Sequence, residues 1–124
     1  MKNRDPGRTF RLHLGAWLLC AAGLPALAAE APPPDAAAVE RGGALFQRYC
    51  TECHGRDGRA QVDVISDATD LTQPAHYYNG SSDQDMYTSI ANGAGVAMPA
   101  FSDKFADDRD IWDLVYYIKT LWQQ

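Results

Sequence analysis

Two cysteines and a histidine stand close together in the run Cys50-Thr51-Glu52-Cys53-His54. On a helical turn, side chains three positions apart lie on the same side, so both thiols can reach the two vinyl groups of a haem while the histidine ligates its iron. A redox dithiol would need a βαβ pattern around it, and a structural zinc site would need a second pair of ligands nearby. The sequence has neither pattern, so the motif indicates covalent haem attachment at Cys50 and Cys53.

The N-terminal segment has the order of a secretory signal peptide. Residues 1–11 carry four basic side chains against one acidic side chain, and the apolar stretch that follows ends in Ala26-Leu27-Ala28. We therefore expect residues 1–28 to be a signal peptide, with cleavage after Ala28 or Ala29. The remaining 96 or 95 residues suffice for one domain.

Two other fates of this segment stay open. It could remain as a membrane anchor, although His13 and Pro25 interrupt the apolar stretch. Cys20 could be lipidated, although Leu19 stands before it where a small residue would be expected. After cleavage only Cys50 and Cys53 would remain, which leaves no cysteine for a structural disulfide.

The chain is acidic, and export would make it more so. Removal of residues 1–28 leaves 7 basic against 15 acidic side chains, a net charge of about −8. This charge argues against nucleic acid as a partner, because nucleic-acid binding depends on basic side chains that neutralise phosphates. The acidity favours either solubility or docking to a basic protein surface.

Folding is expected to begin after a proline-rich linker. Residues 29–35 contain Pro32-Pro33-Pro34, which cannot continue a helix, and residues 36–124 form the expected domain. With Asp35 as N-cap, apolar spacing predicts one helix that runs directly into the haem motif. Gly42 and Gly43 each cost this helix about 1 kcal/mol relative to alanine, which favours close approach of another helix there.

Two further helices are predicted, and the class is all-α. Acidic residues gather at 107–110, and apolar residues then recur at three-to-four spacing to the end of the chain. A middle helix should span roughly residues 83–91, with Ser82 and Asp85 as its capping pair. A short helical turn is expected near Asp70, and residues 55–69 look like loop.

These features together resemble class I mono-haem cytochromes c over nearly all of the expected mature chain. Members of that family have a glycine eight residues and an aromatic four residues before the first haem cysteine, which are Gly42 and Phe46 here. A leucine and an aromatic three apart on the last helix are matched by Leu114 and Tyr117. The resemblance implies that the N- and C-terminal helices cross at the glycine around one covalently bound haem c.

The resemblance also implies an axial methionine directly before a proline in a glycine-rich loop. Met98 fits this position: it precedes Pro99 and lies 44 residues beyond His54. His54 and Met98 are thus the expected iron ligands, while Met86 and His76 remain rivals for the sixth position. The family's Gly-Pro pair soon after the haem motif is missing here, which leaves the hydrogen-bond acceptor for His54 open.

The expected function is that of a soluble periplasmic electron carrier rather than an enzyme. Its partners would be periplasmic or membrane-bound redox proteins, met in transient complexes by a monomer: a donor dehydrogenase and an acceptor oxidase or reductase. A second hypothesis is a dedicated cytochrome subunit of a dehydrogenase, such as a quinoprotein alcohol dehydrogenase, or of a reductase. A third is a haem enzyme or gas sensor whose sixth iron position is open or labile.

Overall fold

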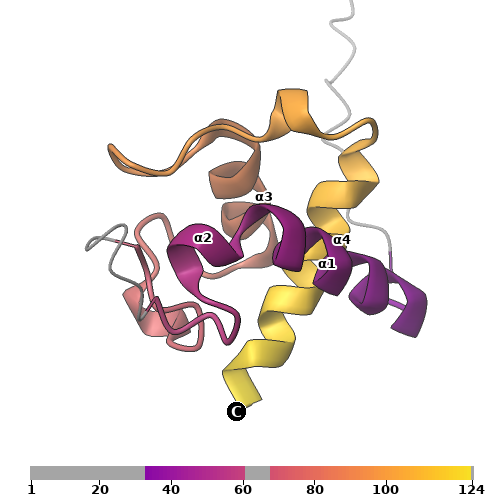
Figure 1. The fold of residues 1–124 in the computed structure, drawn as a ribbon, viewed down its shortest axis with the longest axis horizontal. Coiled ribbons are helices and arrows are strands. Elements are labelled where there is room, and N and C mark those ends of the chain that lie inside the picture. Colours follow the sequence, from indigo (N-terminus) through magenta and orange to yellow (C-terminus); the bar gives the residue numbers. More distant parts are fainter. Residues whose placement is uncertain (1–32, 61–67, 124) are drawn as a thin grey trace, which may run out of the picture.

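The computed structural model describes residues 33–60 and 68–123, which fold as helices joined by loops (Figure 1). Within these residues there is no strand, apart from one isolated backbone pairing between Ala94 and Met98. The all-α prediction is confirmed. The expected signal peptide at 1–28 and most of the expected linker lie outside the described residues. No helix in the described ranges is long and apolar enough to span a bilayer.

The part of the chain that the structure describes holds four α-helices: α1 (Ala36–Tyr49), α2 (Thr51–His54), α3 (Asp83–Asn92) and α4 (Asp108–Thr120). Three short 3-10 turns accompany them: η1 (Pro74–His76), η2 (Ser102–Lys104) and η3 (Leu121–Gln123). Each of the longer helices begins where a side chain caps its first turn, as the sequence predicts. Asp35 accepts from the backbone N–H of Ala38 at 2.6 Å, and Ser82 accepts from that of Asp85 at 3.1 Å.

The N-terminal helix is interrupted just where the haem motif begins. A single helix was expected, whereas α1 ends at Tyr49 and α2 starts at Thr51, with Cys50 between them. The Thr51 hydroxyl donates to the carbonyl of Gln47 at 3.1 Å, a back-bond of the kind that bends helices. Backbone bonds from Cys50 N to Phe46 O and from His54 N to Cys50 O still join the two segments.

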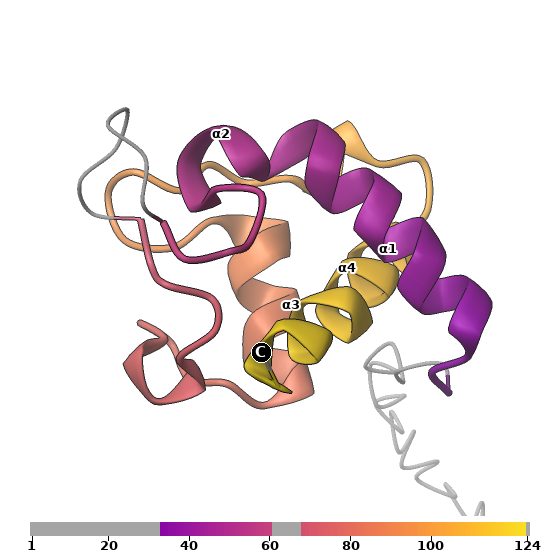
Figure 2. The same ribbon diagram turned by 60° about the horizontal axis from the view of Figure 1, so that its bottom comes forward.

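α1 crosses α4 at Gly42, and Figures 1 and 2 show the crossing from two directions. A Cβ atom added at Gly42 would overlap the carbonyl oxygen of Asp113 and would lie 2.9 Å from the Cβ of Tyr117. The missing side chain is therefore what permits this approach, as the sequence predicts. Phe46, one turn further on, is fully buried and its ring centroid lies 5.2 Å from that of Tyr117.

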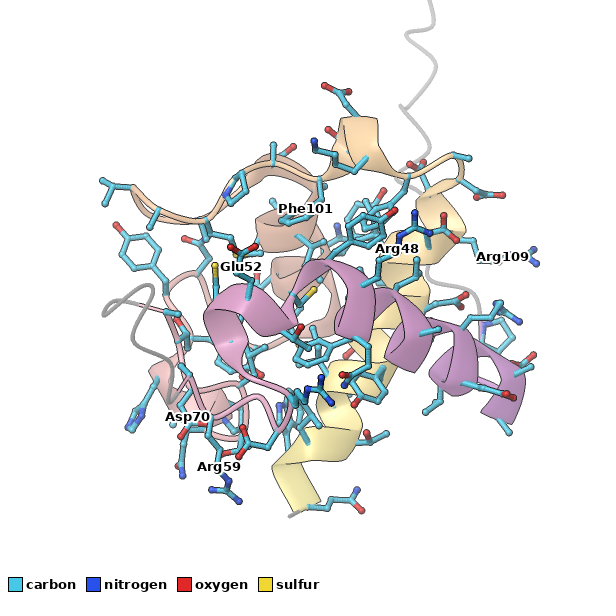
Figure 3. All side chains as sticks on the ribbon, viewed as in Figure 1. Arg48, Glu52, Arg59, Asp70, Phe101 and Arg109 are labelled. Atoms are coloured by element: carbon cyan, nitrogen blue, oxygen red, sulfur yellow. The ribbon has the colours of Figure 1, made fainter. Side chains whose placement is uncertain are left out.

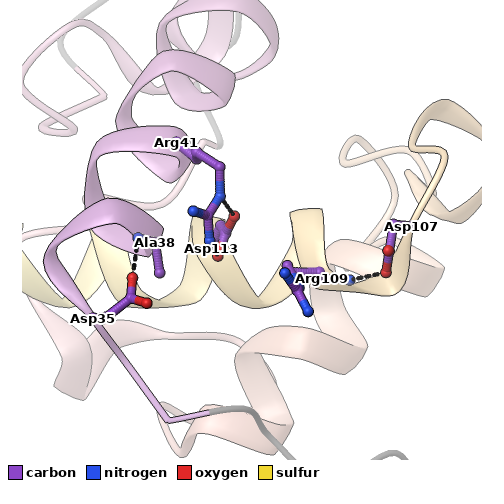
Figure 4. Close-up of polar contacts among 6 residues, drawn as sticks. All are labelled: Asp35, Ala38, Arg41, Asp107, Arg109 and Asp113. Carbon is purple, nitrogen blue, oxygen red and sulfur yellow. Dashed lines mark hydrogen bonds and ion pairs between the residues drawn. The ribbon is translucent and has the colours of Figure 1, made fainter.

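One ion pair joins the same two helices (Figure 4). Asp113 is 1% exposed, and Arg41 donates to both its oxygens, from Nε at 2.6 Å and from Nη2 at 3.0 Å. Hydrogen bonding to Asp113 raises the pKa of Arg41 above its ordinary value. The pair satisfies a carboxylate that would otherwise be buried without a partner.

The core lies between α4 and the two helices that pack against it, α1 and α3. Its buried apolar side chains include Phe46, Met86, Ile90, Ile111, Trp112, Leu114, Val115, Ile118 and Leu121.

A second local prediction is wrong: the turn near Asp70 is not helical. The Asp70 carboxylate accepts from the backbone N–H and the hydroxyl of Thr72, at 2.9 and 2.6 Å, and thus holds a side-chain-capped turn instead. The helical turn comes later, in η1, where Pro74 supplies a fixed φ at the first position.

Candidate functional site

A cavity of about 300 Å³ opens between α2 and the loop that follows α3, and a smaller one of about 80 Å³ adjoins it. In Figure 1 this loop is drawn in orange and runs above α1 and α2. Apolar side chains dominate the lining, and within residues 33–60 and 68–123 no charged side chain contributes to either cavity. Both cavities share the lining residues Cys50, His54, Thr69, Tyr78, Ala94, Met98 and Phe101.

α2 and the residue before it bring the two thiols to this cavity. Cys50 and Cys53 are half-buried, are not joined to each other, and both line the larger cavity. Burial, with a smaller contribution from Cys53, raises the pKa of the Cys50 thiol to about 12. The free thiol is therefore neutral at neutral pH and adds no charge to the apolar lining.

His54, the last residue of α2, is held by a hydrogen bond through its Nδ1. That atom lies 2.9 Å from the carbonyl oxygen of Thr69, which can only accept, so the ring proton must be on Nδ1. Burial lowers the pKa of His54, and the bond to Thr69 opposes this effect in part. The neutral ring thus leaves the Nε2 lone pair free to ligate a metal.

Thr69 fills the role that the sequence left open. No local pattern marked it, because it lies fifteen residues beyond His54 in the chain and acts through its backbone. The capped turn of Asp70 and Thr72 directly after it is the one sequence signal that could have drawn attention to this position.

Met98 comes from a different chain segment, the loop after α3, and lines the same cavity. The backbones of Ala94 and Met98 bond in both directions, at 3.2 and 3.3 Å, so the loop folds back on itself. Gly93 makes this possible: its φ is +83°, and a Cβ atom there would lie 2.6 Å from the carbonyl oxygen of Met98. Phe101 N then donates to Ile90 O at 3.0 Å and ties the loop to α3.

Met86 and His76, the two other candidates for the sixth iron ligand, lie in different parts of the structure. Met86 is 3% exposed within the core and lines the smaller cavity. His76 is exposed on η1 and is not among the lining residues of either cavity. The structure thus brings together all four residues expected to hold the cofactor, Cys50, Cys53, His54 and Met98, and leaves His76 apart.

The cavities fit a haem in the chemistry of their walls. A covalently attached haem needs an apolar slot with the two cysteine thiols at one edge. It also needs a neutral ligand atom of the protein on each side of its iron. The smaller cavity is also lined by Tyr77, by Tyr78 and by Asn79, whose amide donates to the Ser89 hydroxyl at 3.0 Å. Phe101, labelled in Figure 3, contributes an aromatic wall.

Comparison with known proteins gives the family. Residues 37–118 match the family model of cytochrome c oxidase, cbb3-type, subunit III. The cbb3-type cytochrome c oxidase subunit FixP of Azorhizobium caulinodans is 32% identical over 91 residues, which are 73% of this chain. The chain spans only 30% of the length of that relative.

Two solved structures share the fold at low sequence identity. Cytochrome c6 of the diatom Phaeodactylum tricornutum is 22% identical, with a TM-score of 0.56 over 68% of this chain and 94% of that one. Cytochrome cL of the marine methylotrophic bacterium Methylophaga aminisulfidivorans is 20% identical, with a TM-score of 0.59 over 69% of this chain and 54% of the other. The chain therefore belongs to the family of cytochrome c oxidase, cbb3-type, subunit III, and it is a class I c-type cytochrome whose cofactor is haem c.

Proposed function

We propose that this chain is a periplasmic carrier of single electrons, with Cys50 and Cys53 as the thioether attachment points and His54 and Met98 as the two axial ligands. The observation that carries the proposal is that these four side chains, from two distant chain segments, line one apolar cavity. Bound haem c supplies one-electron exchange between ferrous and ferric iron, at a potential that a thioether ligand raises relative to two histidines.

The protein's own part is to hold the ligand atoms still and to keep water away. His54 is fixed by Thr69, and Met98 is fixed by the paired backbone of its loop. A ligand set that keeps its geometry in both oxidation states limits reorganisation during electron transfer. His54 and Met98 would together hold the iron of a bound haem and would leave no position for a substrate, which favours a carrier over an enzyme or gas sensor.

The rim of the cavity is the surface where a redox partner would dock. Tyr78 is 78% exposed and Val96 is fully exposed, and both line the larger cavity. Such apolar side chains exclude water from a contact without committing the partners to a long-lived complex. The net acidic charge of the chain suits a partner with a basic surface.

The family match favours a terminal oxidase as the electron acceptor. FixP is named as a subunit of a cbb3-type cytochrome c oxidase, and this chain matches part of it. A second candidate is therefore a cytochrome subunit within an oxidase, in place of a free carrier that visits one. Purification of the native chain distinguishes the two candidates. An oxidase should copurify with a subunit even after washing with salt, and should not copurify with a free carrier.

Covalent attachment is tested by extraction with acidified solvent, because thioether bonds survive conditions that strip a haem held only by ligation. The wild type should keep all its haem on the polypeptide, and a redox titration should follow a single one-electron step. A Cys50→Ala variant should retain one thioether bond. Complete extraction of haem from the wild type would overturn the proposed attachment.

A further inference from the structure

The hydroxyl of Tyr77, a residue that lines the smaller cavity, joins two other residues in a small hydrogen-bond network. It donates to the carbonyl of Leu71 at 2.7 Å and accepts from the indole Nε1 of Trp122 at 2.9 Å. The two rings meet edge to face, with centroids 6.2 Å apart. Burial raises the pKa of Tyr77, so the hydroxyl stays protonated at neutral pH and can act as donor.

This network holds the segment that supplies the acceptor for His54. Leu71 follows Thr69 by two residues, and its backbone is fixed at both ends: its carbonyl accepts from Tyr77, and its N–H donates to Gly58 O at 2.7 Å. Leu71 also lies inside the turn that the Asp70 carboxylate closes by accepting from the Thr72 N–H; Figure 3 labels Asp70. A shift of Leu71 would therefore move the Thr69 carbonyl as well.

The C-terminal end of the chain anchors the network from the other side. Leu121 is 2% exposed and packs so closely on Gly58 that a Cβ there would lie 2.7 Å from Leu121 Cδ1. Lys119 pairs with Asp83 at 2.5 Å and also stands 5.9 Å above the Trp122 ring. Trp122 itself lines neither cavity.

We propose that Tyr77 and Trp122 are positioning residues for the iron ligand: they hold the Thr69 carbonyl within hydrogen-bond reach of His54 Nδ1 and thereby set the reduction potential. The inference rests on the proposed function, since it takes His54 as an axial ligand. A hydrogen bond from Nδ1 makes the imidazole a stronger electron donor, which stabilises ferric iron. Loss of the network should weaken that bond and shift the potential to more positive values.

The test compares hydroxyl and indole deletions in the haem-loaded protein. Tyr77→Phe removes the central hydroxyl and keeps the ring, and Trp122→Phe removes the indole donor at a residue outside the cavity. Tyr117→Phe is the matched control, because it deletes a half-buried tyrosine hydroxyl on α4 that has no part in this network. For each protein we would measure the midpoint potential and, by NMR of the reduced state, the exchange rate of the His54 Nδ1 proton.

Both network variants should shift the potential upward and speed exchange of the Nδ1 proton, whereas Tyr117→Phe should change neither. The double variant should shift the potential no further than Tyr77→Phe alone, because Trp122 acts through Tyr77. A loss of stability without these two changes would overturn the positioning role.

The same experiment separates failure of this inference from failure of the proposed function. If the wild-type NMR spectrum identifies His54 as an iron ligand and the variants leave both readouts unchanged, only the positioning role is wrong. If His54→Ala keeps the wild-type spectrum of the iron, His54 is no ligand, and the proposed ligand set and this inference fall together.

Discussion

α1 and α4 come into close contact at Gly42. Its neighbour Gly43 also faces α4, but it meets a side chain there and not the backbone. At Gly42 an added Cβ would overlap the backbone carbonyl of Asp113, which cannot move without moving α4. At Gly43 it would lie 3.0 and 3.1 Å from ring atoms of Tyr117, a side chain that can give way. Two adjacent glycines therefore carry different constraints.

Gly42→Ala should lower the free energy of unfolding by about 1–3 kcal/mol, since overpacking outweighs the gain in helix propensity. Gly43→Ala is the control: alanine gains about 1 kcal/mol of propensity there, which offsets the smaller clash. Denaturant unfolding of the three proteins measures the difference. Equal midpoints for the two variants would contradict the tight crossing at Gly42.

At the scale of the elements, α1 and α4 are joined by both apolar packing and the pair between Arg41 and Asp113. The carboxylate is almost fully buried, whereas the side chain of Arg41 is 47% exposed. Solvent screens the exposed charge of Arg41. Most of the stability lost on breaking the pair therefore comes from leaving the buried carboxylate of Asp113 without its hydrogen-bond donors. The pair therefore serves to fix how the helices sit against each other.

Arg41→Gln should lower the thermal midpoint, because it leaves Asp113 buried without a cation. Adding Asp113→Asn should restore part of the loss, since the amide carries no charge. Arg109→Gln is the matched control at the first turn of α4, where the side chain makes no charged contact in the described structure (Figure 4). Additive losses in the double variant would show that the two residues do not act as a pair.

Signals that are local in the chain predicted the elements well. The caps at Asp35 and Ser82, the apolar spacing of the last helix and the glycine at 42 each have a physical cause within a few residues, and each appears in the structure. The break at Cys50 and the turn at Asp70 were missed, because side-chain bonds to nearby backbone groups competed with the helix there.

At the scale of the whole molecule, the candidate site depends on contacts between segments far apart in sequence. The motif at residues 50–54 and the methionine before Pro99 could be recognised one by one, but their convergence on one cavity comes from the crossing of α1 and α4 and the return of the loop after α3. Thr69 acts through a backbone carbonyl, marked in the sequence only by the capped turn that follows it. Trp122 acts through a single N–H, which leaves no pattern in a sequence.

The most direct test of the account is the far-red charge-transfer band that a thioether sulfur gives with ferric haem iron. We expect the band in the wild type, its loss with a lower potential in Met98→Ala, and its retention in Met86→Ala, which removes the other methionine that lines the site. Absence of the band from the wild type, or its survival in Met98→Ala, would contradict the His54 and Met98 ligand set on which the carrier function rests.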